Sequence, residues 1–321
     1  MHRSGPPLTR RALLGAGVVL GAGAVLPGCT GPRPTEPLVI AGGVQPGVYI
    51  NLARTLSEIW YGRLGLPAAP RVLETAGSAQ NMELLTDGRA AVAISQVDVA
   101  ADAAARVTGP TEPRALARLY DDVTHIVVRA DSDLRSIADL RGRRVSIGPG
   151  GSGYQPIAVR LLDVAGIGVA GLGTRAELGL PDAGAALVED RLDAFFWSGG
   201  VPTDGVRELA ARVPIRLLEL GGALDGMRER YPVYSVATVP ANTYGLPGPV
   251  SCLSVRNALL VTEGMDADLA RALIRAAFDE QPRLAQASPA AVTVDSRSAI
   301  GTQPIPLHDG AVAFYRATKG Y

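Results

Sequence analysis

Short extended runs alternate with segments of helical periodicity along most of the chain. Runs typical of buried strands occupy residues 38–41, 71–75, 91–95, 144–147 and 194–197. Apolar positions three or four apart predict helices over residues 49–61, 78–85 and 154–165. Strands that alternate with helices are typical of α/β layers with mostly parallel sheets. The pattern therefore predicts an α/β protein.

One helix–turn–strand unit is echoed within the chain. Residues 82–95 align with residues 185–198, and each segment ends in an apolar strand that stops at a serine. Because two separate strand–helix series accompany this echo, we expect two related lobes. The strand-end serines, Ser95 and Ser198, would then face one shared cleft.

The N-terminus has the layout of an export signal. Basic residues, among them the pair Arg10-Arg11, precede an apolar run over residues 12–26 that is too short to span a bilayer. The arginine pair also resembles a twin-arginine signal. We therefore expect a protein exported to the outer face of the plasma membrane.

A possible lipid anchor follows the apolar run. Gly28-Cys29 resembles the lipobox of bacterial lipoproteins, where the thiol is acylated and the chain is cut in front of it. We expect residues 1–28 to be removed, Cys29 to carry lipid and the Pro-rich residues 29–37 to form a short tether. The alternative is an ordinary cleaved signal with an incidental cysteine.

Charge and cysteine content narrow the class of protein. The chain has 31 basic and 31 acidic residues; loss of residues 1–28 removes three arginines and no acid, which leaves 28 against 31, a net charge of −3. No basic excess favours nucleic acid as a partner. With Cys29 acylated, Cys252 has no cysteine to pair with, so the fold must depend on its core instead of on disulfides.

Four junctions between predicted strands and helices are rich in glycine and serine. They lie at residues 41–49, 75–81, 148–154 and 198–203. Ligands of open α/β sheets bind outside the carboxyl ends of strands, where glycine lets backbone N–H groups approach and helix N-termini attract anions. Any one junction is more typical of a turn or cap. Four at corresponding strand ends predict a site for a carboxylate or phosphate.

The sequence G-x-G-x-x-G at residues 148–153 does not predict a dinucleotide site. The acidic residue that such a site expects about 20 positions further on is missing from residues 169–174, and the lysine of a phosphate-binding P-loop is missing too. Ser152 is not in a nucleophile elbow, because Tyr154 stands where the closing glycine belongs. We therefore expect no cofactor.

Six short segments carry a resemblance to a known family through their order and spacing. They are residues 42–49, 75–81, 85–98, 139–153, 193–202 and 304–311. With them the chain resembles the solute-binding subunit of TRAP transporters of the TAXI family over nearly its whole mature length. The resemblance implies an α/β fold of the periplasmic-binding-protein type II class, with two lobes joined by hinge strands and a ligand cleft between them. Lobe 1 would comprise residues 38–127 and 258–321 and lobe 2 residues 128–257, with crossings near 126–128 and 259–261.

The resemblance also implies a function. A monomer would capture a small anionic solute, either a glutamate-like amino acid or a dicarboxylate or keto acid, and deliver it to a TRAP-type membrane permease. Ligand contacts carried over by position are Gly43, Gly47, Val48, Tyr49, Gly77, Ser78, Asn81, Gln96, Ser152, Gly153, Ser198 and Gly200. Backbone groups and hydroxyls would hold the acid, and Asn81 and Gln96 its other polar end.

Two alternatives stay open. A binding protein for a different importer or a sensor would have the same site. An exported enzyme on this fold would need a nucleophile beside a base, and no local motif supplies one. We expect structural roles for His125 and His308 and a capping or solvent-facing role for Asp98, while Trp197 is either core or pocket wall.

Overall fold

The computed structural model describes residues 36–45, 47–288, 290 and 297–318. The predicted signal, Cys29 and most of the predicted tether lie outside the described residues. None of the helices in the described part of the chain has the length and hydropathy needed to cross a bilayer.

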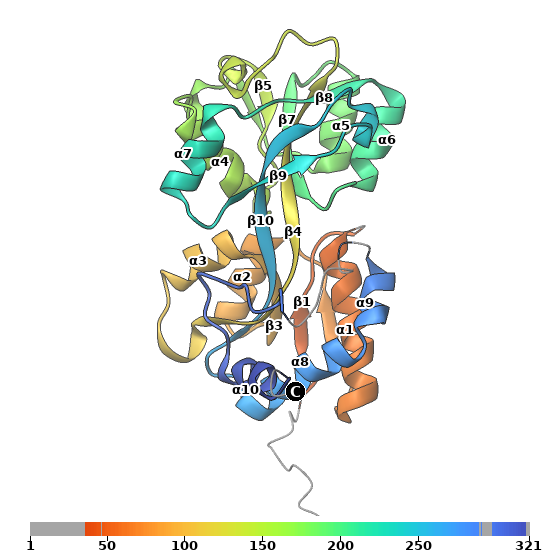
Figure 1. Cartoon of the computed structure of the whole chain (residues 1–321), viewed down its shortest axis with the longest axis vertical. Helices are drawn as coiled ribbons and strands as arrows, with labels where there is room; N and C mark the ends of the chain where they lie inside the picture. Colours follow the sequence, from red (N-terminus) through yellow and green to blue (C-terminus); the bar gives the residue numbers. More distant parts are fainter. Residues whose placement is uncertain (1–35, 46, 289, 291–296, 319–321) are drawn as a thin grey trace, which may run out of the picture. The chain divides into compact units, whose positions relative to one another are not determined.

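A mixed sheet with two long central strands organises the described chain (Figure 1). Its order is β2 (Arg71–Leu73), β1 (Val39–Ala41), β3 (Val92–Gln96), β10 (Val250–Thr262), β4 (Pro113–Arg129), β7 (Ala194–Gly199), β5 (Arg144–Ser146) and β6 (Thr174–Ala176). Two further strands flank the centre: β8 (Ile215–Leu217) pairs with β4, and β9 (Ser235–Val239) pairs with β10. The predicted α/β class is confirmed.

Strand direction differs between the ends and the centre of the sheet. β1 runs parallel to β2 and β3, and β5 runs parallel to β6 and β7, as predicted. The central strands β4 and β10 are antiparallel to each other and to their neighbours. β4 has 17 residues and β10 has 13, so each can pair with one set of strands in its first half and another in its second. The runs expected as hinge strands, residues 126–128 and 259–261, lie inside them.

Helices cover the two ends of this sheet. They are α1 (Val48–Leu64), α2 (Ser78–Thr86), α3 (Val97–Ala104), α4 (Tyr154–Val164), α5 (Leu180–Val188), α6 (Asp204–Arg212), α7 (Gly222–Arg230), α8 (Ala267–Asp279), α9 (Gln281–Ala287) and α10 (Asp309–Thr318). We call β1–β3 with α1–α3 and α8–α10 the first lobe, and β5–β9 with α4–α7 the second lobe. Residue boundaries between the lobes stay a prediction.

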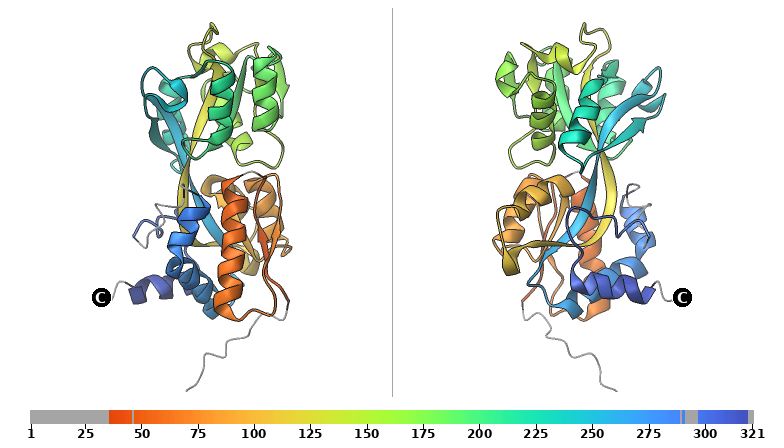
Figure 2. Two further views of the ribbon diagram at one scale, coloured as in Figure 1. Left: turned by 90° about the vertical axis from the view of Figure 1, so that its right-hand side faces the viewer. Right: turned by 60° about the vertical axis from the view of Figure 1, so that its left-hand side comes forward.

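The C-terminal helices return to the start of the chain. Figure 2 shows α1 beside α8 and α9, and these helices are in contact. Trp60 on α1 is fully buried, and its indole N–H donates a hydrogen bond of 3.0 Å to the carbonyl oxygen of Leu273 on α8. An indole that buries its ring must also satisfy its N–H. This contact therefore fixes α8 against a helix more than 200 residues earlier in the chain.

His308 holds the loop before α10. Its Nε2 lies 3.1 Å from the carbonyl oxygen of Met265, and the backbone N–H of Gly310 donates to its Nδ1 over 3.1 Å. The predicted structural role of His308 is confirmed.

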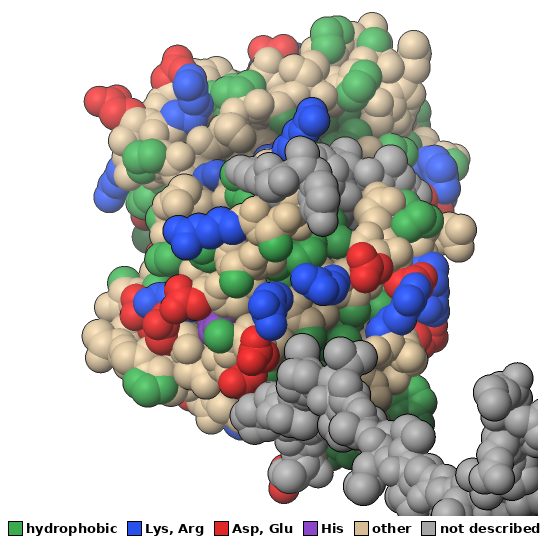
Figure 3. Space-filling view, turned by 60° about the horizontal axis from the view of Figure 1, so that its bottom comes forward, with side chains coloured by type: hydrophobic (Ala, Val, Ile, Leu, Met, Phe, Trp, Pro, Cys, Tyr) green, Lys and Arg blue, Asp and Glu red, His purple; other side chains and the backbone are tan. Residues whose placement is uncertain are grey.

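Exposed arginine and glutamate side chains form ion pairs on the surface of the first lobe. Arg63 pairs with Glu280, and Arg283 pairs with Glu58 over 2.9 Å, so α1 and α9 are also linked at the surface. On the face shown in Figure 3, positive and negative side chains adjoin one another. Such exposed pairs contribute little to stability, because water and salt screen them.

Candidate functional site

Buried polar side chains from both lobes and both central strands meet where β3 and β7 end. We call this group the central polar cluster; it comprises Tyr49, Ser78, Gln96, Asp122, Ser198 and Asn257. The sequence predicted four of its members as ligand contacts but not Asp122 or Asn257.

Gln96 is the hub of the cluster. It is the last residue of β3, and its side chain is 2 % exposed. Its Nε2 donates to Asp122 Oδ2 over 2.9 Å and to Ser198 Oγ over 3.2 Å, which joins β3 to β4 and to the second lobe. Its backbone N–H donates to Ser78 Oγ over 3.1 Å, which ties β3 to the first turn of α2.

Tyr49 closes the cluster from the first turn of α1. Its hydroxyl lies 3.1 Å from Ser78 Oγ and donates to Asn257 Oδ1 on β10. The ring packs edge-on against Tyr120 with centroids 6.3 Å apart. Burial, and next the nearby Asp122 carboxylate, raise the pKa of Tyr49 well above its ordinary value. The phenol is therefore a protonated donor at neutral pH.

The loop before α4 brings the second lobe directly onto the cluster. A β-carbon at Gly153 would overlap Gln96 Oε1 and lie 2.7 Å from Ser78 Oγ, so any other residue here would displace the hydrogen-bonded ends of those two side chains. Gly77, with φ +132°, faces the same loop: a β-carbon there would lie 3.3 Å from the α-carbon of Ser152. The second and third predicted junctions thus meet across the lobes.

The first turn of α2 donates two hydrogen bonds to a carbonyl oxygen of the opposite lobe. The backbone N–H groups of Ala79 and Gln80 donate to the carbonyl oxygen of Gly151 over 3.1 and 3.2 Å. Helix α2 has no side-chain cap of its own, so these two amides depend on an external acceptor. An oxygen from the second lobe therefore sits where the sequence predicted an anion-binding helix N-terminus.

Several buried atoms near the cluster lack a hydrogen-bond partner. Within the described residues they include Gln96 Oε1, Asp122 Oδ1, Thr124 Oγ1 and Asn257 Nδ2. Thr124 lies on β4 directly opposite Ser198 of β7. Buried polar groups are nearly always paired with protein atoms or ordered water, so several unpaired atoms around one point mark it as the candidate site.

Asp122 is the residue that sequence reasoning missed. It is 4 % exposed, and burial raises its pKa from the ordinary value of 3.8 to about 6, although hydrogen bonds from Gln96 and Asn257 act in the opposite direction. Asn257 lies close enough to have this effect, yet its Nδ2 makes no hydrogen bond of standard geometry. The only available signal was an acid within a strand of otherwise buried residues, beside the half-buried Asp121 that pairs with Arg118.

Asn81 supports the site from behind. Its amide nitrogen donates to the carbonyl oxygens of Gly42 and Ile94 over 2.6 and 2.8 Å, and its Oδ1 accepts from Thr75 Oγ1 over 2.5 Å. The side chain is fully buried. Through these bonds Asn81 links the end of β1, β3 and the second junction. Both of its amide hydrogens are already used, so in this conformation it has none to donate to a ligand.

The other predicted contacts lie around the edge of the site. Gly43 packs beneath Tyr49, since a β-carbon there would be 3.0 Å from Tyr49 Cβ. Gly47 and Val48 begin α1, and the Gly200 carbonyl accepts from the Thr203 hydroxyl over 2.6 Å. Gly47, Val48 and Gly200 make no hydrogen bond to the cluster in the described structure. Whether any of the twelve residues binds a ligand stays a prediction.

Only one of the two strand-end serines reaches the cluster. The hydroxyl of Ser95 donates to the backbone carbonyl of Gln96 over 3.0 Å, whereas Ser198 receives the Gln96 side chain. Side chains alternate across a strand, so Ser95 and Gln96 point to opposite faces. The expectation that Ser95 would face the shared cleft was wrong, and Gln96 takes its place.

A second contact between the lobes contains Asp98. Arg160 of α4 donates to Asp98 Oδ2 on α3 over 2.9 Å and also pairs with Asp102, while the hydroxyl of Tyr234 donates to Asp98 over 2.6 Å. The Asp98 side chain is fully buried, and burial raises its pKa although Tyr234 and Arg160 act in the opposite direction. Of the two roles expected for Asp98, the solvent-facing one was wrong, because the second lobe supplies its partners; Asp98 lies in the first turn of α3, and the capping role stays a prediction.

His125 and Trp197 lie beside the site on paired positions of β4 and β7. His125 is fully buried, its Nδ1 lies 2.8 Å from the Val123 carbonyl oxygen, and burial lowers its pKa to about 4. Trp197 is half-buried; it donates to Thr203 Oγ1 over 3.1 Å and packs edge-on against Tyr154 at 5.2 Å. His125 is therefore neutral, and Trp197 packs at the edge of the buried hydrophobic core.

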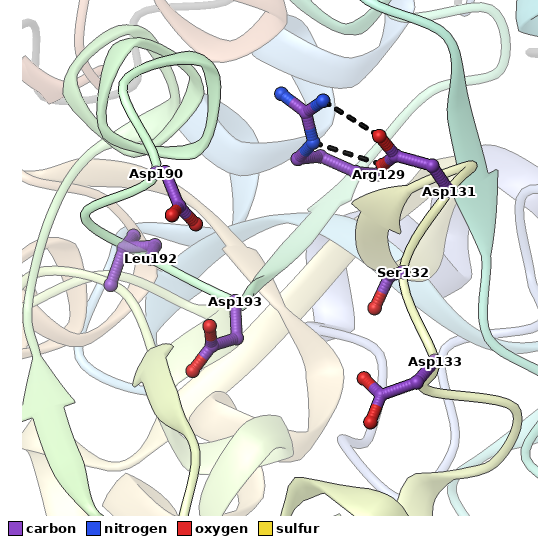
Figure 4. A pocket seen from close by; sticks show the side chains of 7 residues that line it. All are labelled: Arg129, Asp131, Ser132, Asp133, Asp190, Leu192 and Asp193. Carbon is purple, nitrogen blue, oxygen red and sulfur yellow. Dashed lines mark hydrogen bonds and ion pairs between the residues drawn. The ribbon is translucent and has the colours of Figure 1, made fainter.

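A separate cavity of about 460 Å³ lies on the second lobe, at the other end of β7 (Figure 4). Its lining is rich in acids, but these have arginine partners: Asp131 with Arg129 over 2.8 Å and Asp193 with Arg144 over 2.6 Å. The cavity is therefore a surface network of ion pairs and shares no residue with the central polar cluster.

Comparison with known proteins places these features in a wider context. The sequence matches the NMT1-like family over residues 40–318. Among solved structures, XAC2383 from Xanthomonas citri bound to chloride is 15 % identical with a TM-score of 0.55, covering 88 % of this chain and 100 % of that one. The same protein bound to ATP is 15 % identical with a TM-score of 0.53, covering 88 % of this chain and 99 % of that one. The periplasmic aliphatic sulphonate binding protein SsuA from Escherichia coli is 17 % identical with a TM-score of 0.48, covering 88 % and 84 %. At this identity the likeness to XAC2383 concerns the fold alone.

Proposed function

The chain belongs to the NMT1-like family. We propose that it is a solute-binding protein with the type II periplasmic-binding-protein fold and that it captures a small carboxylate outside the plasma membrane. The proposal includes delivery of that solute to a TRAP-type permease of the kind served by TAXI-family subunits, which the six sequence segments resemble.

One observation carries the choice of a carboxylate. The amides of Ala79 and Gln80, in the first turn of α2, hold an acceptor oxygen that comes from Gly151 in the second lobe. Helix N-termini favour acceptors that carry negative charge, because the unpaired N–H groups and the helix dipole act together. A carboxylate oxygen would satisfy the same two amides at least as well as the neutral carbonyl does.

Closure between lobes supplies the binding mechanism. The bonds Gln96–Ser198 and Ala79–Gly151 join the first lobe to the second at the site, so a ligand bound there would exchange them for bonds to itself. A molecule that bridges two lobes stabilises the arrangement in which both contact it. We therefore expect the ligand to favour the closed form.

Catalysis has little chemical support in the described residues. Burial raises the pKa of the Cys252 thiol to about 12, so this thiol is not an activated nucleophile. Burial lowers the pKa of His125 to about 4, and its only described hydrogen bond is to a backbone carbonyl. A binding role needs neither group.

Thermal unfolding in the presence of candidate solutes tests the proposal. A ligand that binds only the folded state at 100 times its Kd adds about 2.7 kcal/mol of stability. The purified protein would be screened against amino acids, keto acids and dicarboxylates, with neutral sugars and peptides as the matched set. We expect at least one small acid to raise the melting temperature. A shift with sugars or peptides and none with acids would contradict the proposal.

Export and anchoring form a separate part of the proposal. We propose that residues 1–28 direct export and that Cys29 carries the lipid, which would hold the protein at the membrane. Fractionation of cells that express the wild type and Cys29→Ala tests this point. The wild type should sediment with membranes and the variant should not; equal distribution of both would exclude the anchor.

A further inference from the structure

We propose that Asp122 makes this site selective for a solute that carries a protonated amino group beside its carboxylate. The ligand is then an amino acid, not a keto acid or a dicarboxylate. This inference rests on the proposed function and narrows its class of substrate.

Asp122 is a buried carboxylate without a compensating cation. It lies near the middle of β4, is 4 % exposed and forms no ion pair with any residue that the structure describes. The groups that face it are the amides of Gln96 and Asn257 and the phenols of Tyr49 and Tyr120. Those groups are neutral, so among the described residues nothing nearby balances a negative charge.

Two other acids act on Asp122 in the same direction as burial. Asp121 and Asp98 both raise its pKa. Asp121 and Asp98 have arginine partners of their own, Arg118 and Arg160. The uncompensated negative charge at this end of the site is therefore that of Asp122 itself. An uncompensated charge in a protein interior is costly unless something binds it.

The unpaired atoms beside Asp122 include two acceptors. Asp122 Oδ1 and Gln96 Oε1 are buried and make no hydrogen bond of standard geometry, although the amide of Asn257 faces Asp122; a further partner for these two oxygens must donate hydrogen bonds. An ammonium group has three N–H donors and a positive charge, which matches both requirements. A second carboxylate would bring further acceptors and a like charge, and a keto oxygen has no hydrogen to donate.

Gln96 joins the two unpaired acceptor oxygens to the first turn of α2. The backbone N–H of Gln96 binds Ser78, the first residue of α2, and its side chain binds Asp122. Gly153 of the second lobe approaches both Gln96 and Ser78. An α-amino acid carries its ammonium and carboxylate groups on one carbon. The two groups therefore fit neighbouring ends of a site built around a single glutamine.

Matched pairs of ligands test the inference directly. Binding of L-glutamate and α-ketoglutarate, L-leucine and α-ketoisocaproate, and L-alanine and pyruvate would be measured by isothermal titration calorimetry at about pH 7.5. Each pair differs at the α-carbon substituent alone. The proteins compared are the wild type, Asp122→Asn and Asp121→Asn, the last being the neighbouring acid that already pairs with Arg118.

We expect the wild type to bind at least one amino acid about tenfold or more tightly than its keto acid, the scale of a hydrogen bond to a charged group. Asp122→Asn should remove that preference by weakening the binding of the amino acid, and Asp121→Asn should retain the preference. Keto acids that bind the wild type as tightly as amino acids, or a preference that survives in Asp122→Asn, would overturn the inference and leave the proposed function intact. If no acid of either series binds, both fail. The wild-type preference needs no variant, so the inference is testable even if Asp122→Asn does not fold.

Discussion

Replacing Asp122 with asparagine should stabilise the ligand-free protein at neutral pH. The substitution keeps the size of the side chain and an acceptor oxygen for the Gln96 amide, which donates to Asp122 over 2.9 Å. It removes the negative charge, which is buried, is 4 % exposed and has no described cation beside it. Its effect on stability therefore reports the cost of that charge.

The magnitude follows from the pKa of Asp122, about 6 in the folded protein against an ordinary value of 3.8. The folded state binds the proton more tightly than the unfolded state, so the stability contributed by the protonated acid is complete below about pH 4. It is lost as the pH rises through about 6. At about 1.4 kcal/mol per pH unit, the loss reaches about 3 kcal/mol above pH 7. Asparagine does not titrate, so Asp122→Asn loses no stability from this position as the pH rises.

Urea unfolding of the wild type and Asp122→Asn between about pH 4 and pH 8 measures this difference. The gain in unfolding free energy from the substitution should be about 2.4 kcal/mol larger at pH 7.5 than at pH 4, because at pH 4 the unfolded-state acid is already partly ionised. Asp98 also titrates with a raised pKa, but it is present in both proteins and cancels in the difference. Asp121→Asn is the matched control. It loses the ion pair with Arg118, which offsets its stability, but it retains Asp122 and should therefore retain the loss of stability as the pH rises through about 6.

Parallel stability curves for the wild type and Asp122→Asn across this range would refute the reasoning. They would mean that the carboxylate is solvated, or paired with a cation, in the protein in solution.

Three further substitutions probe the supports of the site. Gly153→Ala should destabilise the closed form by about 1–3 kcal/mol through overpacking and weaken ligand binding in calorimetry by up to about a hundredfold. Gly62→Ala, whose β-carbon would meet open space on α1, should leave binding unchanged, and equal effects of the two would contradict the overlap. Asn81→Ala should lower the unfolding free energy in urea by about 2 kcal/mol or more, because it leaves buried carbonyl groups unpaired; a loss below about 0.5 kcal/mol would exclude its bracing role. Arg160→Ala should cost about 3–5 kcal/mol by leaving Asp98 buried without its cation, and a second change, Asp98→Asn, should restore part of the loss in the same assay.

Local pattern alone was sufficient to predict the alternating strands and helices. The predicted helix over residues 49–61 is α1 (Val48–Leu64), and the predicted strand at 194–197 is β7 (Ala194–Gly199). Hydrophobic periodicity depends on neighbouring residues, so it is visible in a single sequence. The glycine-rich junctions were visible for the same reason. The long antiparallel strands β4 and β10 were not, because their length depends on partners from both lobes.

Tertiary structure decided which polar residues meet. Tyr49 and Asn257 are 208 residues apart in the sequence, and Gln96 and Ser198 are 102 apart, yet each pair is joined by a hydrogen bond. No local motif marks Asp122, since an acid within a strand has the same pattern whether it faces solvent or a buried site. Its isolation, and with it the inferred preference for an amino group, exists only because two lobes close around the centre of β4 and exclude water from it.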